Sequence, residues 1–162
     1  MAEIFKQSII MEILKNRIDI KAGKMTYGQR LTLHMIIESD KSGKDKVNSV
    51  FICLHGFIPD EEQYSELVDY FRDICDGIKY WILQESLLKY EPTLKEKAKF
   101  NRIASVKLND KSTPTEKTIN ALANEYNVEP ADVLNWEYKK VFDIFSNDLE
   151  KYNQEVNCSQ NN

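Results

Sequence analysis

Residues 60–82 read DEEQYSELVDYFRDICDGIKYWI and carry the longest helical pattern of this 162-residue chain. Asp60 and Gln63 have the spacing of a capping box, in which both side chains satisfy amide groups of the first helical turn. Gly77 interrupts the helix, which indicates close packing against a neighbouring segment or a bend. We expect a helix that ends before Pro92 and keeps the helical period through Tyr64, Leu67, Val68, Phe71, Ile74, Cys75, Ile78, Trp81 and Ile82.

Two helices are predicted before this segment. Thr26 and Gln29 repeat the capping-box spacing, so a helix should begin there and run to about Ser39. Its inward face should contain Leu31, Met35 and one of Ile36 or Ile37. After a polar loop to Lys46, a shorter helix is marked by apolar residues at helical spacing before a glycine suited to the left-handed helix end: Val47, Val50, Phe51, Leu54 and Gly56.

The N-terminal residues carry a weaker pattern. Apolar residues recur irregularly in pairs over 2–15, which favours a helix over a strand. Residues 17–21 alternate as Arg-Ile-Asp-Ile-Lys, which is typical of a short strand or of an extended connection. We therefore expect at most one short strand or hairpin near the N-terminus.

Four further elements are predicted after Pro92. A capping box at Thr93 predicts a basic helix over 94–106, and a second box at Thr113 opens a helix that Asn127 ends. A short helix follows over 130–134, and helical spacing returns over 138–149. The polar tail over 153–162 is expected to be disordered.

The composition supports a mainly α fold. Only 5 glycines and 4 prolines are present, too few for the frequent turns of a sandwich or barrel. We expect one compact helical domain of about seven helices over 1–152, with a subdivision near 92–112 left open. The apolar run over 50–58 is too short to cross a membrane, and no signal peptide is recognisable, so the expected place is the cytoplasm.

Catalytic and metal-binding patterns are absent from the sequence. There is no G-x-S-x-G, no phosphate-binding glycine loop and no H-E-x-x-H. No chelating spacing relates the candidate metal ligands, which are His34, His55, Cys53 and Cys75. We expect neither an enzyme nor a cofactor, and reduced thiols at Cys53, Cys75 and Cys158.

Two kinds of binding protein remain. Residues 119–136 place one helix against another as in a helix-turn-helix, but Glu129, Asp132 and Glu137 would repel DNA. Residues 89–117 carry 8 basic and 4 acidic side chains, and their role is left open. A peptide groove is the second possibility, and the aromatic residues that could line it, or else form ordinary core, are Trp81, Trp136, Tyr138 and Phe142. Trp136 should hold the short helix against the one that follows it.

Residues 122–136, LANEYNVEPADVLNW, followed by Val141-Phe142-Asp143-Ile144, resemble the end of bacteriophage tail assembly chaperones. Thr26-Tyr27-Gly28-Gln29 also resembles the first helix of small phage morphogenesis proteins from gut Bacteroides-type phages. The likeness covers about a third of the chain. It implies a non-catalytic helical protein that binds hydrophobic helical stretches of the tail tape-measure protein in the host cytoplasm. A nucleic-acid-binding regulator and a permanent virion component are the alternatives.

Overall fold

The computed structural model describes residues 1–88 and 113–160. Within these ranges the chain is helical and contains no strand, so the prediction of a mainly α fold is confirmed. Its elements are α1 (Ala2–Lys15), α2 (Tyr27–Glu38), α3 (Gly43–His55), the 3₁₀ turn η1 (Glu61–Gln63), α4 (Tyr64–Leu87), α6 (Pro114–Tyr126), α7 (Pro130–Leu134) and α8 (Tyr138–Gln160). The basic helix predicted over 94–106 and the subdivision near 92–112 lie outside the described residues.

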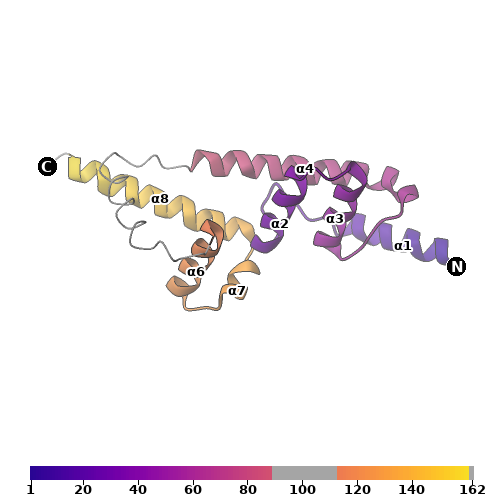
Figure 1. The fold of residues 1–162 in the computed structure, drawn as a ribbon, viewed down its shortest axis with the longest axis horizontal. Helices are drawn as coiled ribbons and strands as arrows, with labels where there is room; N and C mark the ends of the chain where they lie inside the picture. The colour runs from indigo at the N-terminus through magenta and orange to yellow at the C-terminus, as the bar shows by residue number, and fades with distance from the viewer. Residues whose placement is uncertain (89–112, 161–162) are drawn as a thin grey trace.

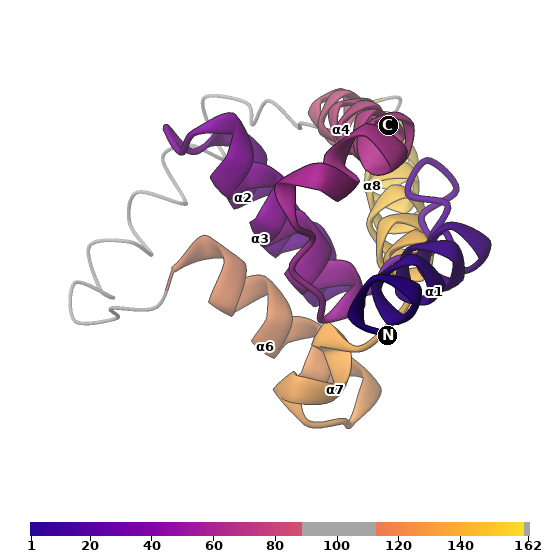
Figure 2. The same cartoon turned by 90° about the vertical axis from the view of Figure 1, so that its right-hand side faces the viewer.

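The helices are arranged along α4 (Figure 1). Helices α1, α2 and α3 lie along one half of the molecule, while α8 continues from the other end of α4 and α6 and α7 lie beside it. The end-on view of Figure 2 shows α1 at the outer edge of this arrangement. The buried apolar side chains nevertheless form one core cluster that extends from α1 to α8.

The helix ends follow the local sequence signals. Thr26 Oγ1 accepts a hydrogen bond from the Gln29 amide at 3.1 Å, and the capping boxes that begin at Asp60 and Thr113 also form. Gly56 ends α3 with φ of 64° and Asn127 ends α6 with φ of 53°, both in the left-handed region. These ends were predictable because each depends on residues within one helical turn.

Two helices are longer than the sequence suggested. Helix α3 begins at Gly43 because Ser42 Oγ accepts from the Asp45 amide at 3.2 Å, so the expected polar loop to Lys46 is shorter. Helix α8 continues to Gln160, and the prediction of a disordered tail from residue 153 is wrong up to that residue. Residues 138–160 contain neither glycine nor proline, so nothing in the local sequence ends the helix.

Residues 16–25 form an irregular connection between α1 and α2, which settles the choice between a strand and an extended segment. Ile20 from this connection packs against Gly77, where an added Cβ would lie only 2.8 Å from Ile20 Cγ2. Gly77 therefore marks close packing against a neighbouring segment, which was one of the two predictions made for it; the other was a bend. None of the described helices is long and apolar enough to span a membrane.

Candidate functional site

The C-terminal helices meet the rest of the chain at a short pairing of backbone segments. The Tyr27 amide donates to the Trp136 carbonyl at 2.8 Å, and the Tyr138 amide donates to the Met25 carbonyl at 2.8 Å. A third bond joins the Lys139 amide to the Gly23 carbonyl at 3.2 Å. We call residues 23–27 and 136–139, together with the side chains packed on them, the junction.

Three of the four aromatic residues singled out in the sequence come together at the junction. The Trp81 ring lies 5.0 Å from the Tyr138 ring and 5.0 Å from the Phe142 ring, both as centroid distances. Trp81 Nε1 donates to the Ile20 carbonyl at 2.7 Å. Only 3% of Trp81 and 2% of Tyr138 is exposed, so both belong to the core. Neither side chain therefore forms the exposed contact surface that the sequence suggested, although Tyr138 also lines a pocket beside Arg30.

Trp136 lies apart from this cluster. Its half-buried ring packs edge-on against Tyr126 of α6 at 5.3 Å, and Lys140 Nζ of α8 lies 3.9 Å from the ring centroid. Trp136 therefore links α6 to α8, whereas the sequence suggested a link between α7 and α8. Phe142 is also half-buried, so Trp136 and Phe142 are the two predicted contact residues that a partner can still reach.

A buried arginine, which the sequence did not single out, joins α2 to α4 beside the junction. Arg30 Nη2 donates to Glu85 Oε2 at 2.8 Å, and the Tyr138 hydroxyl donates to the other oxygen of Glu85. Burial raises the pKa of Tyr138 and the hydrogen bond to Glu85 raises it further, so the phenol remains a donor. Within the described chain, Arg30 Nε and Nη1 have no hydrogen-bond partner. The sequence signal for this burial is the spacing of three residues that relates Arg30 to Tyr27 and to Leu33.

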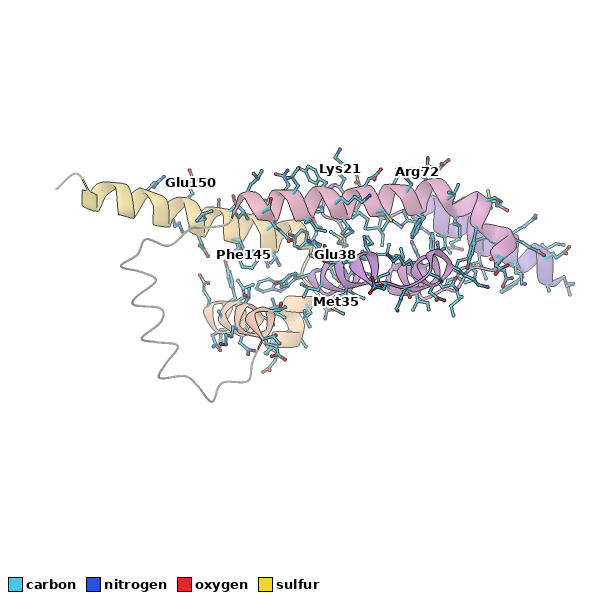
Figure 3. All side chains as sticks on the ribbon, turned by 45° about the horizontal axis from the view of Figure 1, so that its top comes forward. Lys21, Met35, Glu38, Arg72, Phe145 and Glu150 are labelled. Atoms are coloured by element: carbon cyan, nitrogen blue, oxygen red, sulfur yellow. The ribbon has the colours of Figure 1, made fainter. Side chains whose placement is uncertain are left out.

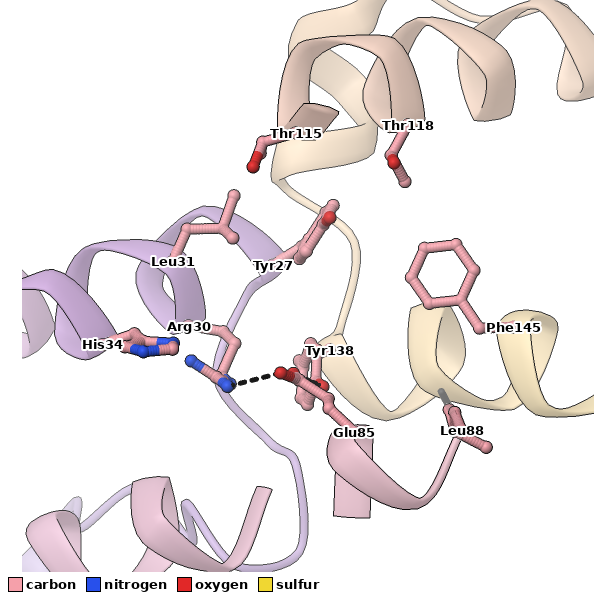
Figure 4. Close-up of a pocket in the computed structure, with 10 residues that line it drawn as sticks. All are labelled: Tyr27, Arg30, Leu31, His34, Glu85, Leu88, Thr115, Thr118, Tyr138 and Phe145. Carbon is pink, nitrogen blue, oxygen red and sulfur yellow. Dashed lines mark hydrogen bonds and ion pairs between the residues drawn. The ribbon is translucent and has the colours of Figure 1, made fainter. Parts of the chain in front are cut away.

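An open pocket of about 440 Å³ lies next to this ion pair (Figure 4). Leu31, Leu88 and Phe145 contribute apolar walls, while Arg30 is already paired with Glu85. His34 at its edge is paired with Glu38 at 2.8 Å. Across residues 1–88 and 113–160, no three His, Cys, Asp or Glu side chains are grouped as a metal site requires. The pocket is also lined by the hydroxyl-bearing residues Tyr27, Thr115, Thr118 and Tyr138.

A larger and more apolar groove, of about 770 Å³, runs between α2 and α3. We call it the α2–α3 groove. Met35 and Ile52 line it and are exposed, with buried Ile36 and half-buried Cys53 between them. Figure 3 shows Met35 on the side of α2 that faces away from α4. The sequence placed Met35 inward, but the buried apolar residues of this helix are Tyr27, Leu33 and Ile36, and the Met35 side chain points outward. The rim is formed by small or polar residues: Gly28, Gln29, Thr32, Ser39, Lys41 and Ser49.

Helices α6 and α7 are the pair that the sequence likened to a helix-turn-helix. Helix α7 has only 5 residues, and its first turn presents Asp132 beside the exposed Glu129. A recognition helix needs cationic or amide side chains directed at bases and phosphates. The first turn of α7 offers carboxylates, while α6 exposes the amides of Asn120 and Asn124.

No protein-family model matches the chain, no curated protein matches it, and no solved structure matches its fold.

Proposed function

We propose that this chain is a non-catalytic phage assembly protein that binds a hydrophobic helical segment of a tail or other virion protein in the α2–α3 groove. The observation that carries the proposal is the pair of exposed apolar side chains, Met35 and Ile52, that line one groove from two helices. The choice of a phage partner rests on the resemblance of residues 122–136 and 26–29 to phage assembly proteins.

The shape and chemistry of the groove suit an apolar helix. A docked helix inserts side chains at i, i+3, i+4 and i+7 into such a groove, and the small residues of the rim let its backbone come close. Met35 adapts to differently shaped partners because its side chain is unbranched and polarisable. Lys41 is the charged residue of the lining, and it favours the carbonyl end of a docked helix or an acidic side chain there.

Peptide binding tests the groove directly. The probe is a fluorescent 18-residue helical peptide with one leucine-rich face, about five turns long, and its scrambled sequence is the negative control. We expect saturable binding of the patterned peptide that changes little with added salt, because apolar burial and not charge drives it. DNA binding would instead weaken steeply with salt.

Two matched variants locate the binding surface. Ile52 is 48% exposed in the groove, and Val68 is 46% exposed on α4 outside it. Ile52→Glu should weaken peptide binding at least ten-fold, because a carboxylate would be desolvated against an apolar face, whereas Val68→Glu should bind like the wild type. An equal loss of peptide binding in both variants, or no peptide binding by the wild type, would refute the proposal that the α2–α3 groove is the binding site.

The assembly role needs a separate measurement in cells that produce virions. A tape-measure or other tail protein should co-purify with the wild type and with Val68→Glu, but not with Ile52→Glu. Presence of the chain in purified particles would mark a permanent virion component rather than a transient chaperone. Retention of duplex DNA at physiological salt, without a virion protein, would favour the nucleic-acid-binding alternative.

A further inference from the structure

Helix α1 is apolar on two opposite faces. Ile10 and Ile13 are buried in the core, with Ile9 and Leu14 packed beside them. The other face exposes large apolar side chains at Ile4, Phe5 and Met11. Exposed large apolar side chains that are grouped on one face of a surface helix mark an interaction surface. Packing in the core accounts for the apolar residues on one face of α1, but it does not account for those on the exposed face.

The exposed side chains form a stripe with a small residue at its centre. Ile4, Ser8, Met11 and Lys15 recur at i, i+4, i+7 and i+11, so they lie along one side of the helix, and Phe5 borders them. Ser8 lies midway along α1, with Ile4 about one turn before it and Met11 about one turn after it. Figure 2 shows α1 at the outer edge of the molecule. We call Ile4, Phe5, Ser8 and Met11 the α1 stripe.

The stripe is complementary to itself in an antiparallel arrangement. A two-fold axis beside Ser8 places Ile4 of one copy against Met11 of the other, and the reverse contact follows by symmetry. The small serine at the crossing lets the two helices come close. A parallel pair would instead bring the two Lys15 ammonium groups together on the stripe.

The charges of α1 also favour this arrangement. Helix α1 has no side-chain cap at its N-terminus, so its first amide groups present partial positive charge. In the antiparallel pair, Glu12 of the second copy lies at the level of Ile4, within this uncapped first turn. Glu12 takes part in no ion pair within the described chain, so its carboxylate is available for that contact.

We propose that two copies of this chain associate through α1 in an antiparallel helix pair whose two-fold axis passes beside Ser8. Helix α1 has 14 residues, about 21 Å of helix. One such pair buries less than the roughly 1,200 Å² of a stable complex. The dimer is therefore weak and forms as concentration rises. This surface is separate from the α2–α3 groove.

Sedimentation equilibrium over micromolar to millimolar concentrations tests the association. The wild type should change from monomer to dimer, and Met11→Glu should weaken dimerisation at least ten-fold, because two carboxylates would enter the apolar contact. Met35→Glu is the matched control, since Met35 is 70% exposed and Met11 is 68% exposed. It should dimerise like the wild type although it impairs the groove. Circular dichroism should show unchanged helix content in both variants. A wild type that stays monomeric, or a Met11→Glu variant that dimerises normally, overturns the proposal.

Disulfide trapping tests the orientation of the pair. The variants are made in a background where Cys53, Cys75 and Cys158 are replaced by serine, and this background must fold and dimerise like the wild type. Ser8→Cys should form a cross-linked dimer under mild oxidation, because the two positions meet at the axis within the roughly 7 Å between Cα atoms that a disulfide requires. Lys15→Cys should not, because the two Lys15 positions lie at opposite ends of the pair. Equal cross-linking at both positions, or at neither, overturns the antiparallel arrangement.

Discussion

Helices α1–α4 and helices α6–α8 are stabilised in different ways. The first group packs along α4 and encloses a continuous set of buried side chains, among them Leu33, Phe51, Leu67 and Ile74. The second group contributes fewer buried apolar residues, which are Leu122, Ala123, Val133, Tyr138 and Val141. It joins the first through the junction, where Trp81 and three backbone bonds hold it. The first group thus contains most of its own core, while the second is positioned by the junction and by the contact of α7 with α2.

Removing Trp81 should have the largest effect, because it breaks the contact between the two groups. The ring packs on Tyr138 and Phe142, and its indole N–H holds Ile20 of the α1–α2 connection. Trp81→Ala should lower the free energy of unfolding by about 3 to 5 kcal/mol. Urea denaturation followed by circular dichroism measures this loss.

The other tryptophan is the matched control. Trp136 is half-buried and contacts Tyr126 and Lys140 at the surface, so Trp136→Ala should cost about 1 to 2 kcal/mol. Equal losses in the two alanine variants would mean that the junction is no more important than the α6–α8 contact, and the contrast between the groups would fail.

A methyl group at Gly77 should have an intermediate effect. The added Cβ would lie 2.8 Å from Ile20 Cγ2 and 3.1 Å from the Lys21 backbone nitrogen, so the connection that leads to the junction must move. Gly77→Ala should lower the free energy of unfolding by about 1 to 3 kcal/mol, although alanine alone favours a helix by about 1 kcal/mol.

Gly43 supplies the comparison for that substitution. An added Cβ at Gly43 has nothing within 4 Å, so Gly43→Ala should leave stability unchanged or raise it slightly. Thermal unfolding of both variants against the wild type distinguishes the outcomes. A Gly77→Ala protein as stable as Gly43→Ala would contradict the close approach of Ile20 to α4.

The smallest expected effect is a pH dependence in the first group of helices. Burial lowers the pKa of His55, whose Nε2 lies 2.8 Å from the Tyr70 hydroxyl. As the pH falls, His55 binds a proton in the unfolded chain before it does so in the folded chain. The contribution of His55 to the free energy of unfolding is therefore fully present above the ordinary histidine pKa of about 6.5 and is lost as the pH falls below it.

Urea midpoints near neutral and mildly acidic pH measure this loss. The wild type should lose stability as the pH falls through that window, and His55→Gln should lose less. His34→Gln is the control because it removes the other histidine and leaves His55 in place. If His55→Gln and the wild type change equally, the pH dependence originates elsewhere in the chain.

Local signals made much of the fold predictable. The capping residues Thr26 and Thr113 and the left-handed ends at Gly56 and Asn127 act within a single turn, so the sequence alone locates them. For Gly77 the sequence predicted either close packing or a bend, and it did not identify Ile20 as the neighbouring residue.

The features that the sequence missed depend on distant partners. Helix α2 has apolar residues on several sides, so periodicity alone did not determine whether Met35 or Leu33 faces inward. Arg30 is buried because Glu85, 55 residues away, accepts its hydrogen bond. Trp81 and Tyr138 carry the same aromatic signal in a core as in a binding groove, so their burial required the position of α8 against α4. Composition and local spacing do not show which residues far apart in the sequence come into contact.

The junction also has a consequence for the order of folding. Lys24 and Glu137 form an ion pair at 3.4 Å although 113 residues separate them. Closing so long a loop costs entropy before any contact is gained, whereas α2, α3 and α4 meet through short connections. Because the chain is made from its N-terminus, we expect the first four helices to pack before α8 is available. The side of the Trp81 ring that faces Tyr138 and Phe142 would then be covered only when α8 packs against α4.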